Sequence, residues 1–180
     1  RALYYVKRLY NSLTLPPKIK GNSNINLRRW REYEEIETDS LWIKDRDNSG
    51  LHSAAYHGNF IPEIPKQMIK RFTKPGSLVL DVFQGFGTTL IECINLNRNY
   101  IGLDINPEAI NRCKEIISSS CQDKVKNLTL DIFEQDNLQF NYEDYLVNRT
   151  KLEANYYFDL VMIHPPYESI IKFTDKKEDF

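Results

Sequence analysis

Four short apolar runs, separated along the chain by more polar segments, constrain the fold of this sequence more than any other feature. The runs occupy residues 77–82, 100–104, 128–131 and 158–163. Short continuous runs rich in Val, Leu and Ile predict strands that are buried on both faces. Because segments with helical spacing lie between the first three runs, we predict a Rossmann-like α/β fold with a mostly parallel central sheet and flanking helices.

The chain is long enough for one hydrophobic core but not for two ordinary domains. We assign residues 1–55 to an N-terminal helix and an irregular extended arm, and residues 56–180 to the core. Pro16 and Pro17 stop the first helix, whose apolar side chains recur at helical spacing between residues 3 and 13. Because the chain does not begin with Met, we expect it to be part of a longer protein whose core continues past its last residue.

Composition narrows the class of protein. Hydrophobic residues make up 41% of the chain and charged residues 27%, which is typical of a soluble globular protein. No apolar run approaches the roughly 20 residues of a membrane-spanning helix, and no signal peptide is evident, so we expect a cytoplasmic location. Cys93, Cys113 and Cys121 lack CxxC spacing, so we predict neither disulfides nor a metal site.

Two helices have clear signals in the sequence. Residues 65–72 are predicted as a helix with Pro65 in its first turn, and its apolar side chains are expected to face inward: Ile64, Met68, Ile69 and Phe72. Asn106 is expected to cap a second helix that runs to about Ser119, with a proline and an acid in its first turn.

Acidic residues follow three of the predicted strands. Asp81, Asp104 and Asp131 are each expected to end a strand. In open α/β sheets, ligands bind beyond the carboxyl ends of the strands. A turn containing Gly85 and Gly87 lets the backbone approach a ligand closely, and an acid after the second strand can accept hydrogen bonds from both hydroxyls of a ribose. This arrangement predicts a nucleoside-containing cofactor.

A nicotinamide dinucleotide is the main alternative cofactor, because GxGxxG followed by an acid is its fingerprint. Leu90 stands at the position of the third glycine, so the fingerprint is broken. Asp81, just before the turn, would repel a pyrophosphate but attract a cationic amino group. The residues therefore favour a cofactor with an ammonium group, and an NAD-binding oxidoreductase remains the alternative.

Residues 81–89, Asp-Val-Phe-Gln-Gly-Phe-Gly-Thr-Thr, resemble the first motif of DNA amino-methyltransferases, whose usual form is D-P-F-x-G-S-G-T-T. Val82 and Phe86 replace the proline and the serine. The resemblance implies a class I methyltransferase fold and S-adenosylmethionine as cofactor. It assigns cofactor binding to His57, Asn59, Phe60, Pro62, Asp81, Phe83, Gly85, Gly87, Thr88, Thr89, Asp104, Ile105, Asp131 and Ile132.

A rigid proline turn follows the fourth apolar run, in the order His164, Pro165, Pro166 and Tyr167. Two prolines remove N–H donors and leave carbonyl groups free to accept hydrogen bonds from an amine. Such acceptors would direct the lone pair of the amine nitrogen toward a methyl donor. An aromatic side chain there can stack on a base that has been flipped out of a duplex.

This run resembles the catalytic tetrapeptide of the same family, which is usually Asp, Asn or Ser followed by Pro-Pro-Tyr or Pro-Pro-Phe. The resemblance assigns catalytic roles to His164, Pro165, Pro166 and Tyr167. His164 departs from the pattern, although a neutral imidazole can still accept a hydrogen bond or take up a proton. The departure leaves adenine and cytosine equally open as targets.

The resemblance implies methyl transfer from S-adenosylmethionine to the exocyclic amine of a base in double-stranded DNA, N4 of cytosine or N6 of adenine. It also implies a restriction-modification system with a restriction or specificity partner. A net charge of −1 is unusual for a DNA-binding protein, although Lys66, Lys70, Arg71 and Lys74 form a local basic cluster. Alternatives are a methyltransferase acting on RNA guanine or protein glutamine, or a non-catalytic cofactor-binding or DNA-binding module.

Overall fold

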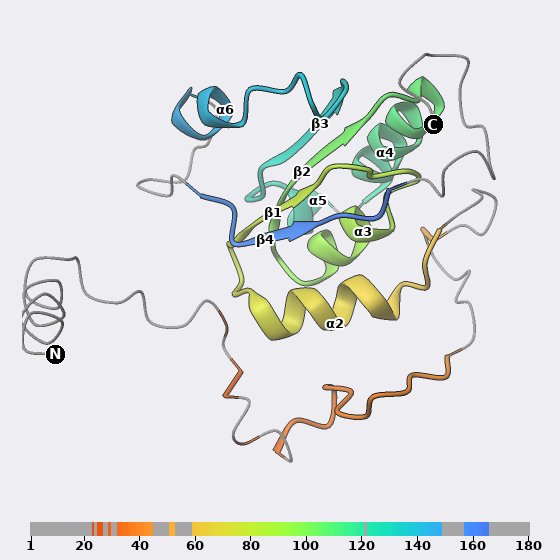
Figure 1. The fold of residues 1–180 in the computed structure, drawn as a ribbon, viewed down its shortest axis with the longest axis vertical. Helices are drawn as coiled ribbons and strands as arrows, with labels where there is room; N and C mark the ends of the chain where they lie inside the picture. The colour runs from red at the N-terminus through yellow and green to blue at the C-terminus, as the bar shows by residue number, and fades with distance from the viewer. Residues whose placement is uncertain are drawn as a thin grey trace, which may run out of the picture.

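The computed structural model describes residues 23, 25–26, 29, 32–44, 51–52, 59–120, 122–148 and 157–165 (Figure 1). Its elements, in chain order, are α2 (Glu63–Phe72), β1 (Leu78–Asp81), α3 (Thr88–Asn95), β2 (Asn99–Asp104), α4 (Pro107–Ser119), α5 (Gln122–Val125), β3 (Leu130–Glu134), α6 (Tyr142–Asn148) and β4 (Leu160–Met162).

The four strands form one parallel sheet in the order β3-β2-β1-β4. β1 lies inside the sheet and pairs with β2 on one side and with β4 on the other. The chain builds the sheet outward from β1 through β2 to β3, and then returns to add β4 at the opposite side of β1. The predicted Rossmann-like α/β fold is therefore confirmed.

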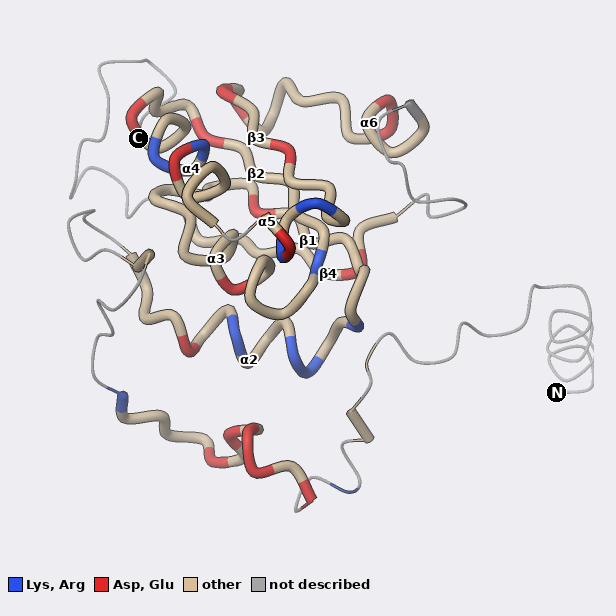
Figure 2. The backbone as a smooth tube through the Cα atoms, turned by 180° about the vertical axis from the view of Figure 1, so that it is seen from behind, with Lys and Arg blue, Asp and Glu red and all other residues tan. Residues whose placement is uncertain are grey.

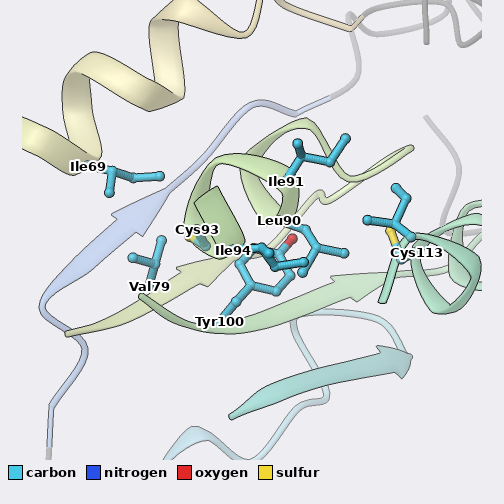
Figure 3. Close-up of a cluster of buried hydrophobic side chains, with 9 residues drawn as sticks. Ile69, Val79, Leu90, Ile91, Cys93, Ile94, Tyr100 and Cys113 are labelled. Atoms are coloured by element: carbon cyan, nitrogen blue, oxygen red, sulfur yellow. The ribbon is translucent and has the colours of Figure 1, made fainter. Parts of the chain in front are cut away.

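Helices cover both faces of the sheet, with α2 and α6 on opposite sides (Figure 1). On one face, buried side chains of α2, α3 and α4 pack on β1 and β2 around Tyr100, which has no exposed surface (Figure 3). On the other face, Tyr145 of α6 packs on Leu78, Leu80, Ile101 and Leu103. Burial on both faces explains why β1 is apolar at every position before its terminal aspartate.

The predicted cap of α4 is confirmed. The Asn106 side chain accepts a hydrogen bond from the Glu108 amide at 2.9 Å, and Pro107 occupies the first helical position. A proline costs nothing there, because the first amides of a helix have no partner within it.

The prediction for α2 needs two corrections. The helix begins at Glu63 and not at residue 65, since the turn at Ile61 and Pro62 already accepts hydrogen bonds from the Ile64 and Lys66 amides. Phe72 is 45% exposed, although helical spacing predicts that it faces inward. It is the last residue of the helix, and its side chain is exposed although the next residue, Thr73, is buried.

The prediction for β3 is also wrong at its end. The strand runs on to Glu134, so Asp131 is its second residue and not its last. Asp131 pairs in register with Ile101, whose side chain faces α6, and its carboxylate accepts a hydrogen bond from the Tyr145 hydroxyl at 2.9 Å. That hydroxyl allows a carboxylate to lie within a strand, which the sequence alone did not reveal.

Part of the N-terminal arm lies against α2. The buried Gln67 side chain donates to the Glu35 carbonyl at 2.9 Å and accepts from the Glu37 amide at 3.0 Å, so it pairs with the arm as a peptide group would. Figure 2 shows acidic residues along this arm and basic residues along α2. Lys70 of the basic cluster is paired with Glu35 at 2.5 Å.

The predicted helix before Pro16 and the side chain of Cys121 lie outside the described residues. Among the residues that are described, no helix is both long enough and apolar enough to cross a membrane.

The contact between Tyr145 and Asp131 predicts how a variant of either residue should behave. Tyr145→Phe removes the hydroxyl and leaves a half-buried carboxylate with one hydrogen bond fewer, so the protein should lose about 1–2 kcal/mol of unfolding free energy. Urea denaturation measures this loss. Tyr142→Phe, which removes the other hydroxyl on α6 from a bond to the Asn137 carbonyl, should cost less. Equal losses would show that the hydrogen bond to Asp131 contributes no more to stability than the hydrogen bond to the Asn137 carbonyl.

Candidate active site

The order of the strands reverses between β1 and β4. β1 is followed by α3 and then β2 on one side, whereas β4 joins β1 on its other side. In open α/β sheets, ligands bind beyond the carboxyl ends of the strands at such a reversal. Asp81 is in register with Met162, and the Val82 backbone amide donates to the Met162 carbonyl at 3.4 Å. His164 therefore lies two residues beyond the strand neighbour of Asp81.

Asp81 ends β1 as a buried carboxyl group, only 3% exposed. Burial raises its pKa to about 6, and the nearby carboxylate of Asp104 adds to the rise. The Thr89 hydroxyl and the Phe83 amide, which donates to Asp81 at 3.2 Å, oppose it in part. None of these groups is a cation, so the described residues leave the charge of Asp81 uncompensated.

The turn between β1 and α3 has backbone conformations that suit glycine. Gly85 has φ +49° and Gly87 has φ +79°, both in the left-handed region. A Cβ on Gly87 would lie 2.9 Å from the Cys113 sulfur of α4, so the turn also packs too closely on that helix for a side chain. The backbone of the turn therefore packs directly on α4 where α3 begins.

Asp104, at the end of β2, fixes this turn from the other side. One carboxylate oxygen accepts from the Gly85 amide at 2.9 Å, and the other accepts from the Asn106 amide at 2.8 Å. Asp104, which the sequence predicts to bind the ribose, thus also links the glycine turn to the cap of α4.

Gln84 is a third contact of the turn, which the sequence analysis missed. Its side chain lies over Gly102 of β2, where a Cβ would be 1.9 Å from Gln84 Oε1, and that oxygen accepts from the Tyr100 hydroxyl at 3.4 Å. The backbone amide of Gln84 donates to the Leu103 carbonyl at 3.1 Å. An isolated glycine within a strand often marks a close approach, so Gly102 was the available signal.

His164 contacts a residue from a distant part of the sequence. Its imidazole lies edge to face with the Phe60 ring, at 5.0 Å between centroids and 68° between planes. Both side chains are half-buried, and burial lowers the pKa of His164 below its ordinary 6.5. The imidazole is therefore mostly neutral at pH 7 and can accept a hydrogen bond. Pro165, which follows, is exposed.

The structure brings most of the predicted site residues to this edge, with one exception. Residues at or next to the ends of β1 and β2, or in the segment before α2, are Asn59, Phe60, Pro62, Asp81, Phe83, Gly85, Gly87, Thr88, Thr89, Asp104 and Ile105. Ile132 of β3 faces the same side of the sheet as Asp81 and packs on the core beneath the turn. Asp131 faces the opposite side and bonds to Tyr145, so the structure does not bring it to the site. His57, Pro166 and Tyr167 lie outside the described residues.

A model of the N6/N4 family, described as DNA methylase, matches residues 5–117, which is more than half of the chain. The chain belongs to this DNA methylase family. The matched residues include the segment before α2, the glycine turn, Asp81 and Asp104, and they end before His164.

Two relatives of this DNA methylase show the extent of the likeness. Type II methyltransferase M.MjaII of Methanocaldococcus jannaschii is 37% identical over 75 residues, which cover 41% of this chain and 14% of the relative. Type II methyltransferase M.Cfr9I of Citrobacter freundii is 38% identical over 92 residues, covering 46% of this chain and 30% of the relative. The chain thus spans less than a third of either relative.

The structural likenesses are weaker. The mycolic acid cyclopropane synthase CmaA1, complexed with SAH and CTAB, has a TM-score of 0.33 at 22% identity and covers 38% of this chain and 23% of its own. P. horikoshii TYW2 in complex with MeSAdo has a TM-score of 0.37 at 22% identity, and the match covers 46% of this chain and 30% of the TYW2 chain.

The raised pKa of Asp81 predicts a pH-dependent cost to folding. The folded protein holds the Asp81 proton more tightly than the unfolded chain, whose carboxyl has a pKa near 3.8. Stability from this group is therefore full below pH 3.8 and is lost as the pH rises through about 6. Asp81→Asn should make the methylase about 3 kcal/mol more stable at pH 8 and change it little at pH 4.

Urea denaturation of both proteins at pH 4, 5, 6 and 8 measures this difference. A destabilised Asp81→Asn protein at pH 8 would contradict the account of Asp81 as an uncompensated charge.

The contact between Gln84 and Gly102 predicts a coupled pair of substitutions. Gly102→Ala should displace the Gln84 side chain and cost about 1–3 kcal/mol of unfolding free energy. Because the closest contact is to Gln84, the double variant Gly102→Ala/Gln84→Ala should lose less than the sum of the two single losses. Urea denaturation of the wild type, the two single variants and the double variant tests this. Additive losses would show that the added methyl group at position 102 clashes with Tyr100 and not with Gln84.

Proposed function

We propose that this chain carries the cofactor site and the acceptor turn of a DNA amino-methyltransferase. The reaction is methyl transfer from S-adenosylmethionine to the exocyclic amine of a flipped base, N4 of cytosine or N6 of adenine. One observation carries the proposal: in a chain of the DNA methylase family, Asp81 and the turn that begins with His164 lie at the ends of adjacent strands, at the point where the sheet order reverses.

The residues at the glycine turn fit S-adenosylmethionine. Asp81 is a buried carboxyl group with no cation among the described residues, so the cationic amino group of the cofactor would compensate its charge. Gly85 and Gly87 let the backbone approach the ligand, and Asp104 places a carboxylate at the end of β2, beside this turn, where the resemblance assigns ribose binding. A pyrophosphate would add negative charge beside Asp81, which disfavours a nicotinamide dinucleotide.

The acceptor turn would orient the amine. A neutral imidazole of His164 and the carbonyl of Pro165 each accept one amine hydrogen, which directs the nitrogen lone pair toward the methyl group. The cofactor supplies a methyl group bonded to a positively charged sulfur, from which it leaves as the new N–C bond forms. The amine then releases one proton, which His164 can take up. By resemblance, Pro166 keeps the turn rigid and Tyr167 stacks on the base.

The DNA and the partners belong to the proposal as well. The family is described as DNA methylase and the relatives are named type II methyltransferases, which supports a DNA substrate. By resemblance, the proposal includes double-stranded DNA, a restriction-modification system with a restriction or specificity partner, and a cytoplasmic location. Since the chain spans less than a third of these relatives, we propose that sequence recognition uses parts of the protein beyond this core.

Labelled methyl transfer by the full-length protein tests the proposal. With S-adenosylmethionine as donor, label should enter unmethylated DNA at adenine N6 or cytosine N4, and His164→Ala should reduce the rate at least about tenfold because an acceptor of the amine is lost. Calorimetry should show S-adenosylmethionine binding that is weakened by Asp81→Asn.

Other outcomes would replace the proposal by a named alternative. Label that enters only RNA or protein would reject the DNA substrate. NAD binding without S-adenosylmethionine binding would favour an oxidoreductase. An unchanged rate in the His164→Ala protein would reject the catalytic role of that side chain.

A further inference from the structure

We propose that Phe60 is a positioning residue for His164: its ring holds the imidazole in one orientation and shields it from water, which keeps the imidazole a hydrogen-bond acceptor for the substrate amine. This inference rests on the proposed function. It assigns Phe60 to the acceptor side of the site, whereas the resemblance assigns it to the cofactor.

The strand beneath His164 does not fix its ring. β4 ends at Met162, so the backbone of the sheet sets the direction in which the chain leaves, but the imidazole turns about two side-chain bonds of its own. An acceptor nitrogen must lie in line with the N–H that it binds. A neighbouring ring that restricts the plane of the imidazole favours this alignment, and the Phe60 ring, 5.0 Å away and inclined by 68°, is such a neighbour.

Phe60 is itself held by structured backbone. It lies directly before the turn in which the Ile64 amide donates to the Ile61 carbonyl at 3.1 Å, and Pro62 then fixes the start of α2. α2 packs against α3 and β4. The position of the Phe60 ring is thus set by the same packing that sets β4, so the two rings keep their relative place although 104 residues separate them.

The same contact favours the neutral imidazole. Phe60 is an apolar neighbour, and burial is the cause that lowers the pKa of His164. Among the described residues, Asp81 is a titratable group on the adjacent strand: its register partner is Met162, which precedes His164 by two residues. A charged imidazolium could not accept a hydrogen bond from an amine. Replacing the ring by a smaller apolar side chain should therefore admit water and make protonation easier.

Nuclear magnetic resonance and kinetics on the full-length protein test the proposal together. In Phe60→Leu, the pKa of His164 should rise toward 6.5, read from its ring resonances, which the His164→Asn variant identifies among the three histidines. The rate of methyl transfer at saturation should fall about tenfold, with the dissociation constant for S-adenosylmethionine within about twofold of that of the wild type. Phe60→Tyr keeps the ring and should restore both properties.

Three controls separate this role from a general effect on folding. Phe72→Leu makes the same exchange at the exposed far end of α2 and should change neither the titration nor the rate. Because Asp81 also titrates at about pH 6, the titration is repeated in an Asp81→Asn background, where the effect of Phe60→Leu should persist. In a His164→Asn background, Phe60→Leu should have little further effect on the rate, because an amide does not change its protonation.

The outcomes are distinct. An unchanged His164 titration in Phe60→Leu overturns the proposal, and so does weaker S-adenosylmethionine binding with an unchanged titration, which would place Phe60 on the cofactor. The titration needs no activity, so a protein that transfers no methyl group would refute the proposed function while the shift in His164 still supported the contact. Equal losses of rate in the wild-type and His164→Asn backgrounds would show that Phe60 does not act through this side chain.

Discussion

The parallel hydrogen bonding of β1 to two neighbours is the constraint on which the rest of the structure depends. β1 pairs with β2 along Leu78–Asp81, and with β4 along Val79–Asp81. Parallel strands present their carboxyl ends at the same edge, so this pairing brings the glycine turn, Asp104 and the residues after β4 together although they are far apart in the sequence. Helices on both faces bury β1 completely up to Asp81, which is why an ionisable group there lies outside water.

The site is arranged at a cost in stability. Asp81 is buried without a compensating cation among the described residues, and Asp104 nearby raises the cost of its charge. Several contacts of the glycine turn offset this cost. The Gly85 backbone amide donates to Asp104, the Gln84 backbone amide donates to the Leu103 carbonyl, and the Gln84 side chain packs on Gly102. A rigid turn that carries an unpaired acid suits a ligand with a positive charge, which is the pattern expected where binding matters more than folding.

Several features were predictable because the signal was local. The apolar runs predicted the four strands, and Asn106-Pro107-Glu108 predicted the start of α4, since a cap depends on residues that are neighbours in the chain. Asp131 was misplaced because an acid after Leu130 resembles a strand end, and the Tyr145 hydroxyl that bonds to its carboxylate comes from α6, 14 residues later. The contact between Gln84 and Gly102 was missed because it joins the turn after β1 to the interior of β2 through space.

The sequence by itself determined the class of fold, the acids at the ends of β1 and β2, and the position of His164 just beyond β4, because strand burial depends on short runs of residues. The tertiary structure alone decided which of the three acids share a face, since a shift of one position along a strand moves a side chain to the other side of the sheet. It also decided that Phe60 lies on His164, because two segments 104 residues apart meet only after α2 and β4 have packed together.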